Sequence, residues 1–584
     1  MRRSIRPLIA LPAALALALA GCSTAATDPT AAAAQPATTS AEVLAANSDV
    51  LTSADLDPGD STTSIDLTGD SAEVTGDGAN VDGSTVTITA AGTYTVSGEL
   101  TGALVVAAGA EDDVVLVLDG ADLTGATGSA LLVSTADHVE VRLADGSTNV
   151  LADPTGYTNA DGPTAALAAD TDLVITGTGS LSVSGSAEDG IASSDALTVE
   201  GGTLTVTAVD DGLRGKQSLA VTGGDLDLTS GGDGLTATED TDTTEGFVLV
   251  SGGTITVDAQ GDAVQAETDL VVTGGTLDLT AGGGASTAVD EEISTKGLKA
   301  GAVIVVEDGT VTVDSSDDAV HSDGTVTIGG GDLTLATGDD GVHADTALDV
   351  SGGSVLVTDS YEGLESAAIS LSGGQIEVTA SDDGINAAGG GTEDAQGDRA
   401  GGTGTATLDI SGGTVVVHAG GDGLDVNGSA TMTGGTVVVH GPASGANGAL
   451  DYDGDFAITG GSLVAVGTTG MAQSPSTGGQ GWINAQVQVE AGQTVQIADA
   501  DGTVLATLVT EEQIGSVVVS LPELAEGEEY QVLTGGTATA EAVGGFSAGG
   551  DGSGATVAAT VTAGESTGGM GGPGDNPPAG PGQG

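Results

Sequence analysis

A phrase of about 22 residues recurs along this chain, and it constrains the fold more than any other feature. The phrase opens on a double glycine, continues as alternating aliphatic and polar residues, and ends on an acidic residue beside a glycine. A repeat of this length is typical of a solenoid, in which repeats stack and a recurring residue becomes a column. The double glycines begin at Gly201, Gly223, Gly252, Gly274, Gly330, Gly352, Gly373, Gly412, Gly434 and Gly460.

Each repeat divides into three short strands. A strand of alternating pattern follows the double glycine, a turn that is usually Asp-Asp-Gly comes next, and two further short strands lead back to the following double glycine. Period-two alternation indicates strands. The pattern predicts an all-β fold: a right-handed parallel β-helix (a solenoid of about 22 residues per coil) with irregular N-terminal coils and a small antiparallel C-terminal cap. Stacked aliphatic side chains suffice for such a core, so an aromatic content of 2% is compatible with it.

The N-terminus is typical of a secreted lipoprotein. Arg2, Arg3 and Arg6 precede a short apolar run that ends in Leu-Ala-Gly-Cys22. This arrangement predicts a signal peptide over residues 1–21 and lipidation of Cys22, the only cysteine. We therefore expect a protein held by lipid on the outer face of the bacterial cell membrane. The alternative is a spare cysteine in an ordinary signal peptide.

Composition divides the rest of the chain. Segments rich in Ala, Thr, Ser and Pro predict tethers, and segments rich in Gly and Pro predict disorder. Two repeats carry acidic insertions, near residues 281–295 and 389–405, which we expect to leave the coils as loops. The expected parts are a flexible tether (22–61), N-terminal β-coils (62–178), the parallel β-helix repeats (179–483), a C-terminal β cap (484–540) and a disordered tail (541–584).

In nearly every repeat an acidic residue stands nine places after the second glycine. Stacked strands are ~4.8 Å apart, so neighbouring carboxylates should repel by about 0.9 kcal/mol in water and about 3.5 at an effective dielectric near 20. Calcium would relieve this repulsion, because Ca²⁺ binds oxygen ligands and can sit between two carboxylates. The acid column reads Asp189, Asp211, Asp233, Asp262, Asp318, Asp340, Glu362, Asp383 and Asp422. Further candidate calcium ligands in the same turns are Glu188, Asp210, Asp317, Asp339 and Asp382.

An alternative interpretation of the acid column is purely structural. Asp-Asp-Gly is an ordinary turn sequence, since Asp bonds to its own backbone and Gly accepts a positive φ. Exposed turn carboxylates can also simply be solvated. The sequence leaves calcium binding and turn formation open.

A second column lies three residues after the acid column. It contains Arg214, Thr236, Gln265, Lys299, His321, His343, Glu365, Asn386 and Asp425, and Lys296 replaces the acid in one repeat. The basic residues of these turns, Arg214, Lys216, Lys296 and Lys299, should either pair internally with aspartates or contact an anionic ligand. The candidate ligand-binding residues are Lys296, Lys299, His321 and His343. His321 and His343 lie one repeat apart, but no third nitrogen or thiolate ligand is evident, so we do not expect zinc there.

The net charge of −75 argues against nucleic acid as a partner, because phosphate binding needs clustered Lys and Arg. We expect a monomer that contacts the membrane only through its lipid. Few aromatic side chains could stack on a sugar. Trp482, Tyr361 and Tyr452 are the candidates, and the first and last of these could equally pack inside the cap.

Several motifs together resemble a known family. They are residues 85–98, 115–120, 141–149, 294–299 and 470–476, together with the Asp-Asp-Gly repeats. In order and number these segments are similar to bacterial carbohydrate-binding-domain-containing proteins with a calcium-containing, pectin-binding right-handed β-helix. The resemblance implies calcium in the coils and binding of an acidic polysaccharide such as polygalacturonate. The family's β-helix resembles that of pectate lyases, and this chain departs from the pattern in its scarcity of basic residues.

Three functions remain open on sequence grounds. The first, which we favour, is a non-catalytic lipoprotein that binds acidic polysaccharide, with calcium bridging protein and sugar carboxylates. The second is a calcium-dependent polysaccharide lyase, in which Lys296, Lys299 or Arg214 would be the base. The third is a calcium-stiffened surface spacer or adhesin with no glycan ligand.

Overall fold

A computed structural model describes residues 38–157, 164–288, 293–389, 404–443, 445, 447–470, 472–540 and 542–565. The predicted signal peptide, Cys22 and the acidic parts of both insertions lie outside these residues. The described chain is almost entirely β, and its two helical segments are one short α-helix and one 3₁₀ turn. Among the described residues, the structure contains no helix of the length and apolarity needed to cross a bilayer.

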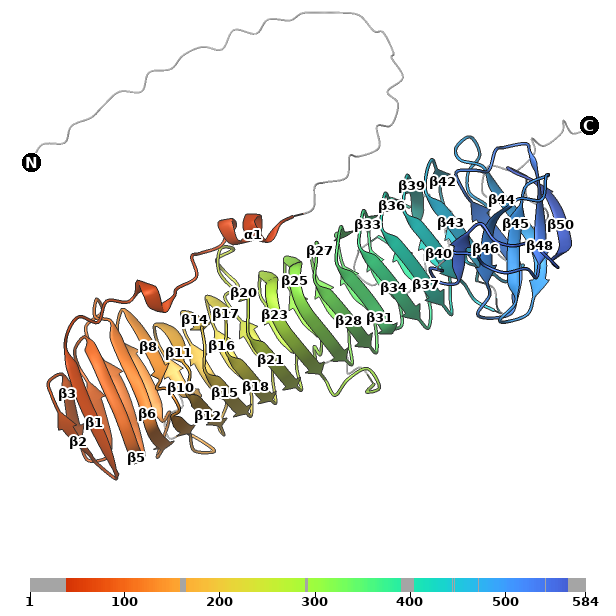
Figure 1. Ribbon diagram of the computed structural model, residues 1–584. Coiled ribbons are helices and arrows are strands. Elements are labelled where there is room, and N and C mark those ends of the chain that lie inside the picture. The colour runs from red at the N-terminus through yellow and green to blue at the C-terminus, as the bar shows by residue number, and fades with distance from the viewer. Residues whose placement is uncertain are drawn as a thin grey trace, which may run out of the picture. The chain divides into compact units, whose positions relative to one another are not determined.

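Strand pairing follows the repeat. Most repeats contribute three strands, and these strands pair in parallel with the strand three places further along the chain (Figure 1). Leu213 is in register with Leu235, and Thr203 with Asp225, an offset of 22 residues. The predicted three-strand repeat and its offset are therefore confirmed.

The strands form three faces, and we call strands β4 to β43 the parallel body. Face 1 contains β9 (Thr148–Ala152), β12 (Ser180–Gly185), β15 (Thr203–Ala208), β18 (Asp225–Ser230), β21 (Thr254–Ala259), β28 (Asp332–Thr337), β31 (Ser354–Asp359), β34 (Gln375–Ala380), β37 (Thr414–Ala419), β40 (Thr436–His440) and β43 (Ser462–Gly467). Face 2 contains β4 (Thr85–Ile88), β7 (Leu131–Thr135), β10 (Ala165–Ala169), β13 (Asp189–Ser193), β16 (Leu213–Gly215), β19 (Leu235–Ala237), β22 (Val264–Ala266), β24 (Leu298–Ala300), β26 (Val320–Ser322), β29 (Val342–Ala344), β32 (Leu364–Ser366), β35 (Ile385–Ala387), β38 (Leu424–Val426) and β41 (Leu450–Tyr452).

Face 3 completes each coil. It contains β8 (His138–Leu143), β11 (Asp172–Gly177), β14 (Ala196–Val199), β17 (Ser218–Val221), β20 (Phe247–Val250), β27 (Thr325–Ile328), β30 (Ala347–Val350), β33 (Ala368–Leu371), β36 (Ala406–Ile410), β39 (Gly428–Met432) and β42 (Phe456–Ile458). Some strands run from one face into the next without a break, namely β1 (Thr62–Gly69), β5 (Gly92–Ala107), β6 (Val114–Gly125), β23 (Asp269–Ala281) and β25 (Val303–Ser315).

One continuous aliphatic core runs through the parallel body. Face 1 strands alternate between exposed and buried positions, as in β15 and β18, and the buried residues belong to this core. The strand register stacks aliphatic residues on one another: Leu213 pairs with Leu235, and Leu235 pairs with Val264 of the following coil. Small contact energies therefore add up along each column of identical side chains.

The second glycine of each pair has a backbone conformation that other residues resist. Its φ is positive in every repeat, for example +97° at Gly202 and +73° at Gly353. At Gly353 an added Cβ would also lie 2.6 Å from the carbonyl oxygen of Gly331, one coil away. The recurring double glycine is thus required both by local φ and by the close approach of stacked turns.

Antiparallel strands lie at both ends of the parallel body. At the N-terminal end β2 (Ala72–Thr75) pairs with β1, and β3 (Ala79–Asp82) pairs with β4. At the C-terminal end β47 (Ile514–Ser520) pairs with both β43 and β44 (Trp482–Val489). A separate antiparallel sheet follows, made of β45 (Thr494–Ala498), β46 (Val504–Val509), β48 (Glu529–Thr534), β49 (Phe546–Ala548) and β50 (Thr556–Thr562). These C-terminal strands enclose a second apolar core.

The fold class predicted from the sequence needs correction. The chain is all-β, but it is not an open solenoid finished by a small cap. Its parallel strands close around one shared core, and further strands lie outside this closed body: the N-terminal hairpins and the C-terminal sheet with its own core. Periodicity specifies which residues stack, whereas closure depends on contacts across the core that a repeat does not encode.

Segments within the expected tether and the expected tail form helices and strands among the described residues. In the expected tether, α1 (Ser40–Ala46) packs Val43 against Phe247 and Val271 of face 3, and Asn47 donates to Asp269 at 2.9 Å. The 3₁₀ turn η1 (Ser53–Asp55) is fixed by Ser53, which donates to Glu200. In the expected tail, β49 and β50 pair with the C-terminal sheet. Low-complexity composition hides these few apolar anchors, which become recognisable only beside their partners.

Candidate functional site

The acid column occupies the turns that lead from face 1 into face 2. Because face 2 strands are in register, the acids of successive coils stack along one edge of the parallel body. The second column follows on the face 2 strands, where Lys299 is in register with His321, and His321 with His343. The structure therefore brings both predicted columns together as one surface, which we call the column face.

Seven acids of the column accept a hydrogen bond from a backbone amide of the next coil through one carboxylate oxygen. Asp211 Oδ1 accepts from the amide of Asp233 at 2.9 Å, and Asp233 Oδ1 accepts from Asp262 at 2.8 Å. Further bonds of this kind join Asp189 to Asp211, Asp262 to Lys296, Asp318 to Asp340, Asp383 to Asp422 and Asp422 to Gly448. The column thus has a structural function in linking coils, which turn chemistry alone did not predict.

The second carboxylate oxygen faces the second column. Arg214 donates through Nε to Asp189 Oδ2 at 2.9 Å, and Lys299 Nζ donates to Asp262 Oδ2 at 3.0 Å. His321 Nδ1 lies 2.7 Å from Asp318 Oδ2, and His343 Nδ1 lies 3.1 Å from Asp340 Oδ2. The predicted internal pairing of basic residues with aspartates is present in this structure.

Lys296, the lysine that interrupts the acid column, is largely buried between two carboxylates. Its Nζ donates to Asp317 Oδ2 and Asp318 Oδ2, each at 2.8 Å. Burial works against its charge, but Asp318 and Asp317 hold the pKa of Lys296 above its usual range. Burial also opposes ionisation of Asp318, yet His321 and Lys296 outweigh it and keep the pKa of that carboxyl well below normal.

Elsewhere in the column, carboxylates lie together, and no arginine or lysine among the described residues bonds them. Burial, with Asp262 and Asp211 nearby, raises the pKa of Asp233 to about 7. Burial raises the pKa of Glu362 to about 7, and burial with Asp383, Asp451 and Asp422 nearby raises that of Asp425 to about 8. Burial and hydrogen bonding to Asp340 raise the pKa of Glu365 to about 8. Glu365 also lies 3.3 Å from His343 Nδ1, whereas Asp233, Glu362 and Asp425 form no ion pair with a described basic residue.

A buried oxygen without a partner lies among these acids. Asn386 is 8% exposed, and its Nδ2 donates to Glu362 Oε2 at 2.7 Å. Its Oδ1 is buried and accepts no hydrogen bond from any residue that the structure describes. In register, Asn386 stands between Glu365 and Asp425. Carboxylates beside an unpaired amide oxygen form the oxygen-only donor set that Ca²⁺ prefers, so the residues here fit calcium.

The remaining predicted ligands differ in their surroundings. Ligand oxygens of Asp317, Asp318 and Asp339 lie within 4.8 Å of one another, but the ammonium of Lys296 already bonds two of these residues. Asp210 is exposed, and Asp382 is half-buried in its turn. The imidazoles of His321 and His343 have centroids 4.9 Å apart, and the third ligand that the sequence lacked is available as Asp318.

Exposed apolar side chains collect on the same edge. Tyr361 is 48% exposed one residue before Glu362, and Val209 and Ile293 are also exposed in acid-column turns. Trp482 and Tyr452 are buried, so both are packing residues. Of the three aromatic candidates, only Tyr361 can meet a sugar ring from solvent.

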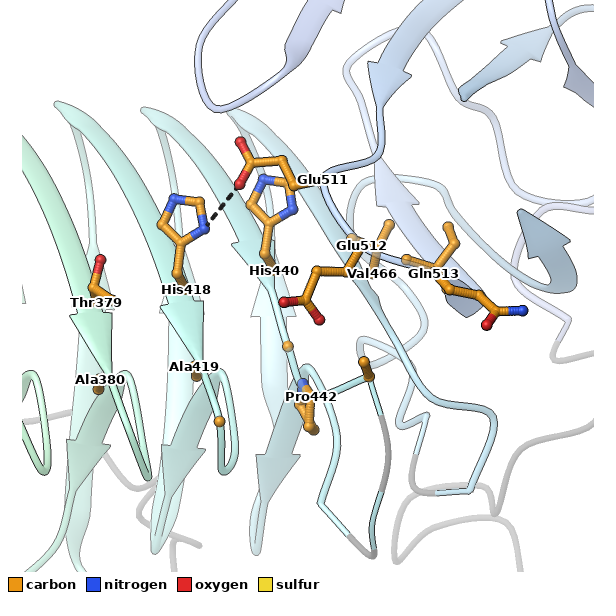
Figure 2. Close-up of a pocket in the computed structure, with 14 residues that line it drawn as sticks. Thr379, Ala380, His418, Ala419, His440, Pro442, Val466, Glu511, Glu512 and Gln513 are labelled. Atoms are coloured by element: carbon orange, nitrogen blue, oxygen red, sulfur yellow. Dashed lines mark ion pairs between the residues drawn. The ribbon is translucent and has the colours of Figure 1, made fainter. Parts of the chain in front are cut away.

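Sequence reasoning missed one cluster altogether. His418 and His440 stand 22 residues apart, which is the repeat length, and they meet Glu511 at the C-terminal end of face 1 (Figure 2). The spacing of the histidines was a usable signal. Glu511 was not, because it comes from a connection between C-terminal strands that follow no repeat.

Three comparisons relate this chain to known proteins. Residues 82–341 match the family model of carbohydrate-binding domain-containing proteins. A carbohydrate-binding domain-containing protein of Acetivibrio thermocellus is 38% identical over 128 residues, which are 21% of this chain and 45% of that relative. This chain therefore spans less than half of the relative's length.

A solved structure, described as a gadolinium derivative of the polysaccharide lyase-like protein from C. thermocellum, is 27% identical with a TM-score of 0.36. The match covers 50% of this chain and 96% of that one. The matched segment 82–341 contains the column face from Asp189 to Asp340. Over this segment, the chain is similar to carbohydrate-binding domain-containing proteins.

Proposed function

We propose that this protein is a cell-surface lipoprotein that binds acidic polysaccharide of the polygalacturonate type on its column face, without cleaving it. The similarity of residues 82–341 to carbohydrate-binding domain-containing proteins supports binding of a glycan. The column face offers regularly spaced carboxylates, paired cations and the exposed ring of Tyr361, which together suit sugar hydroxyls, sugar carboxylates and a sugar face.

Calcium is the proposed bridge between two acidic partners. The observation that carries this step is the unpaired, buried Oδ1 of Asn386 among carboxylates whose pKa values are raised. A Ca²⁺ ion held by Asp383, Asp425 and Asn386 would satisfy that oxygen and offset the like charges. With coordination positions to spare, the ion would also accept a uronate carboxylate. Asp422 and Glu362 are within the same stack and would support the site.

The contacts of the basic residues argue against a lyase. A base that abstracts the uronate proton must be neutral when the substrate binds. Lys296 is held protonated by Asp317 and Asp318. Arg214 bonds Asp189, and Lys299 bonds Asp262 and Ser294. Each candidate base therefore already forms an ion pair with a carboxylate.

The test is retention and cleavage of polygalacturonate by the full chain, with calcium or with chelator. We expect retardation in an affinity gel with calcium, its loss in chelator, and no unsaturated product. Asp425→Asn should lower calcium affinity at least tenfold, while Asp453→Asn, at an exposed position outside the column, should leave it unchanged.

Further variants locate the glycan. Tyr361→Ala, Lys299→Ala and Asp340→Ala should each weaken retention, whereas Val557→Ala, on an exposed residue of the C-terminal sheet, should not. Release of unsaturated sugar would establish the lyase instead. Calcium-dependent melting without any glycan retention would establish the spacer. Unchanged melting and retention in chelator would refute the calcium bridge.

Membrane attachment is tested separately. Cys22→Ser should move the protein from the membrane fraction to the medium and abolish labelling by a radioactive fatty acid. Continued labelling of this variant would refute lipidation at Cys22.

A further inference from the structure

Two stacked imidazoles stand on face 1 where the parallel body meets the C-terminal sheet. His418 of β37 is in register with His440 of β40, and the two rings are 4.8 Å apart with an interplanar angle of 2°. Their neighbours in the same row are Thr379 before and Val466 after, neither of which can pair with an imidazole by charge. The column of face 1 therefore places two nitrogen ligands side by side.

A carboxylate reaches the same point from outside the repeat. Glu511 lies between β46 and β47, and its Oε2 is 3.3 Å from His418 Nδ1. Figure 2 shows the Glu511 side chain converging on both rings. One ligand atom from each of the three residues lies within 4.8 Å of the other two. Two ligands about 2.0–2.1 Å from a tetrahedral Zn²⁺ are about 3.4 Å apart, close to the His418–Glu511 distance.

The Nε2 atom of His440 already forms a hydrogen bond. His440 Nε2 lies 2.9 Å from the carbonyl oxygen of Gly544, which can only accept, so Nε2 carries the proton and Nδ1 keeps its lone pair. Metal-ligating histidines characteristically donate their other ring N–H to a carbonyl in this way.

The three ligands border a cavity of about 420 Å³, lined also by Glu512, Gln513 and Pro442. A fourth coordination position would therefore be reachable from solvent. Two imidazoles, one carboxylate and an open position form a donor set that suits Zn²⁺ or a similar divalent transition metal better than calcium, which prefers oxygen ligands alone.

We infer that His418, His440 and Glu511 form a site for a divalent transition metal such as Zn²⁺, joining the parallel body to the C-terminal sheet. The site lies outside residues 82–341 and away from the column face, so it is independent of the proposed glycan function. Through Glu511 the metal would join a C-terminal connection to two coils, and its binding should stabilise that junction.

The test uses the full chain, stripped with chelator and titrated with Zn²⁺ by calorimetry, with Co²⁺ as a visible-absorption probe of imidazole ligation. We expect one tight equivalent and a higher melting temperature. His418→Ala/His440→Ala should abolish that equivalent. Glu511→Gln, at a half-exposed carboxylate, should weaken it at least tenfold while preserving the fold.

The matched control is the other imidazole pair. His321→Ala/His343→Ala should keep the tight equivalent and its cobalt spectrum. Absence of tight zinc binding in the parent chain, or its survival in the His418→Ala/His440→Ala variant, would overturn the inference. The first of these results would reduce the cluster to a simple His418–Glu511 ion pair.

Discussion

The buried Lys296 supports the sharpest stability prediction, because its removal would leave two carboxylates without their cation. Lys296 is 13% exposed, and Asp317 and Asp318 are 15% and 4% exposed. At an effective dielectric near 20, each ion pair at 2.8 Å has a Coulomb energy of about 6 kcal/mol before desolvation. Breaking a buried pair by removing one partner costs about 3–5 kcal/mol. His321 still contacts Asp318, so we expect Lys296→Met to cost about 3 kcal/mol.

Urea unfolding followed by circular dichroism at pH 7 measures this cost, and hydrogen exchange shows whether the loss is confined to the coils around Lys296. The comparison variant is Lys216→Met. Lys216 also pairs with a carboxylate, Glu239 at 2.9 Å, but is 50% exposed, and we expect no measurable change. A loss in Lys296→Met as small as that in Lys216→Met would refute the reasoning.

A double-mutant cycle separates charge from packing. Asp318→Asn keeps the Oδ1 acceptor for the amide of Asp340 while removing the charge that Lys296 compensates. Lys296→Met combined with Asp318→Asn should therefore recover part of the stability lost in the single lysine variant. Simple additivity of the two changes would show that lost alkyl packing, and not the unpaired carboxylate, causes the effect.

Two further predictions follow from acid titration and from backbone strain. Burial raises the folded-state pKa values of Asp233, Glu362 and Asp425 to about 7, about 7 and about 8. The protonated carboxyls therefore contribute stability that is fully present below the unfolded pKa near 4 and is lost as pH rises through about 7 to 8. In chelator, melting temperature should fall from pH 5 to pH 8, and Asp425→Asn should reduce that fall. A flat profile would contradict the assigned burial. Gly353→Ala should lower the free energy of unfolding by at least about 1–3 kcal/mol, because its φ is positive and an added Cβ would contact Gly331. The control is Gly83→Ala, where φ is +61° but an added Cβ meets nothing within 4 Å, so the loss should be smaller. Equal losses in urea unfolding would show that stacking of the turns is not the constraint.

Much of the parallel body could be predicted from the repeat in the sequence. Glycine pairs, alternating aliphatics and a regular offset identified three strands per coil and predicted that Asp211 would lie beside Asp233. The prediction of stacking was confirmed because one constant strand offset places every recurring residue beside its counterpart in the next coil. The function of the acid column was harder to predict. A turn aspartate that binds the next coil and one that binds an ion occur in the same Asp-Asp-Gly sequence.

The sequence by itself therefore determined which side chains share a column and where a repeat is interrupted, as at Lys296. Only the tertiary structure decided which neighbours those side chains meet: Lys296 between Asp317 and Asp318, Asn386 with an unpaired oxygen, and Glu511 beside His418. Tertiary structure also decided how the coils close and how the C-terminal strands pack beyond them. Columns follow from a local, periodic pattern, whereas these contacts join segments far apart in the chain, and no periodic signal connects them.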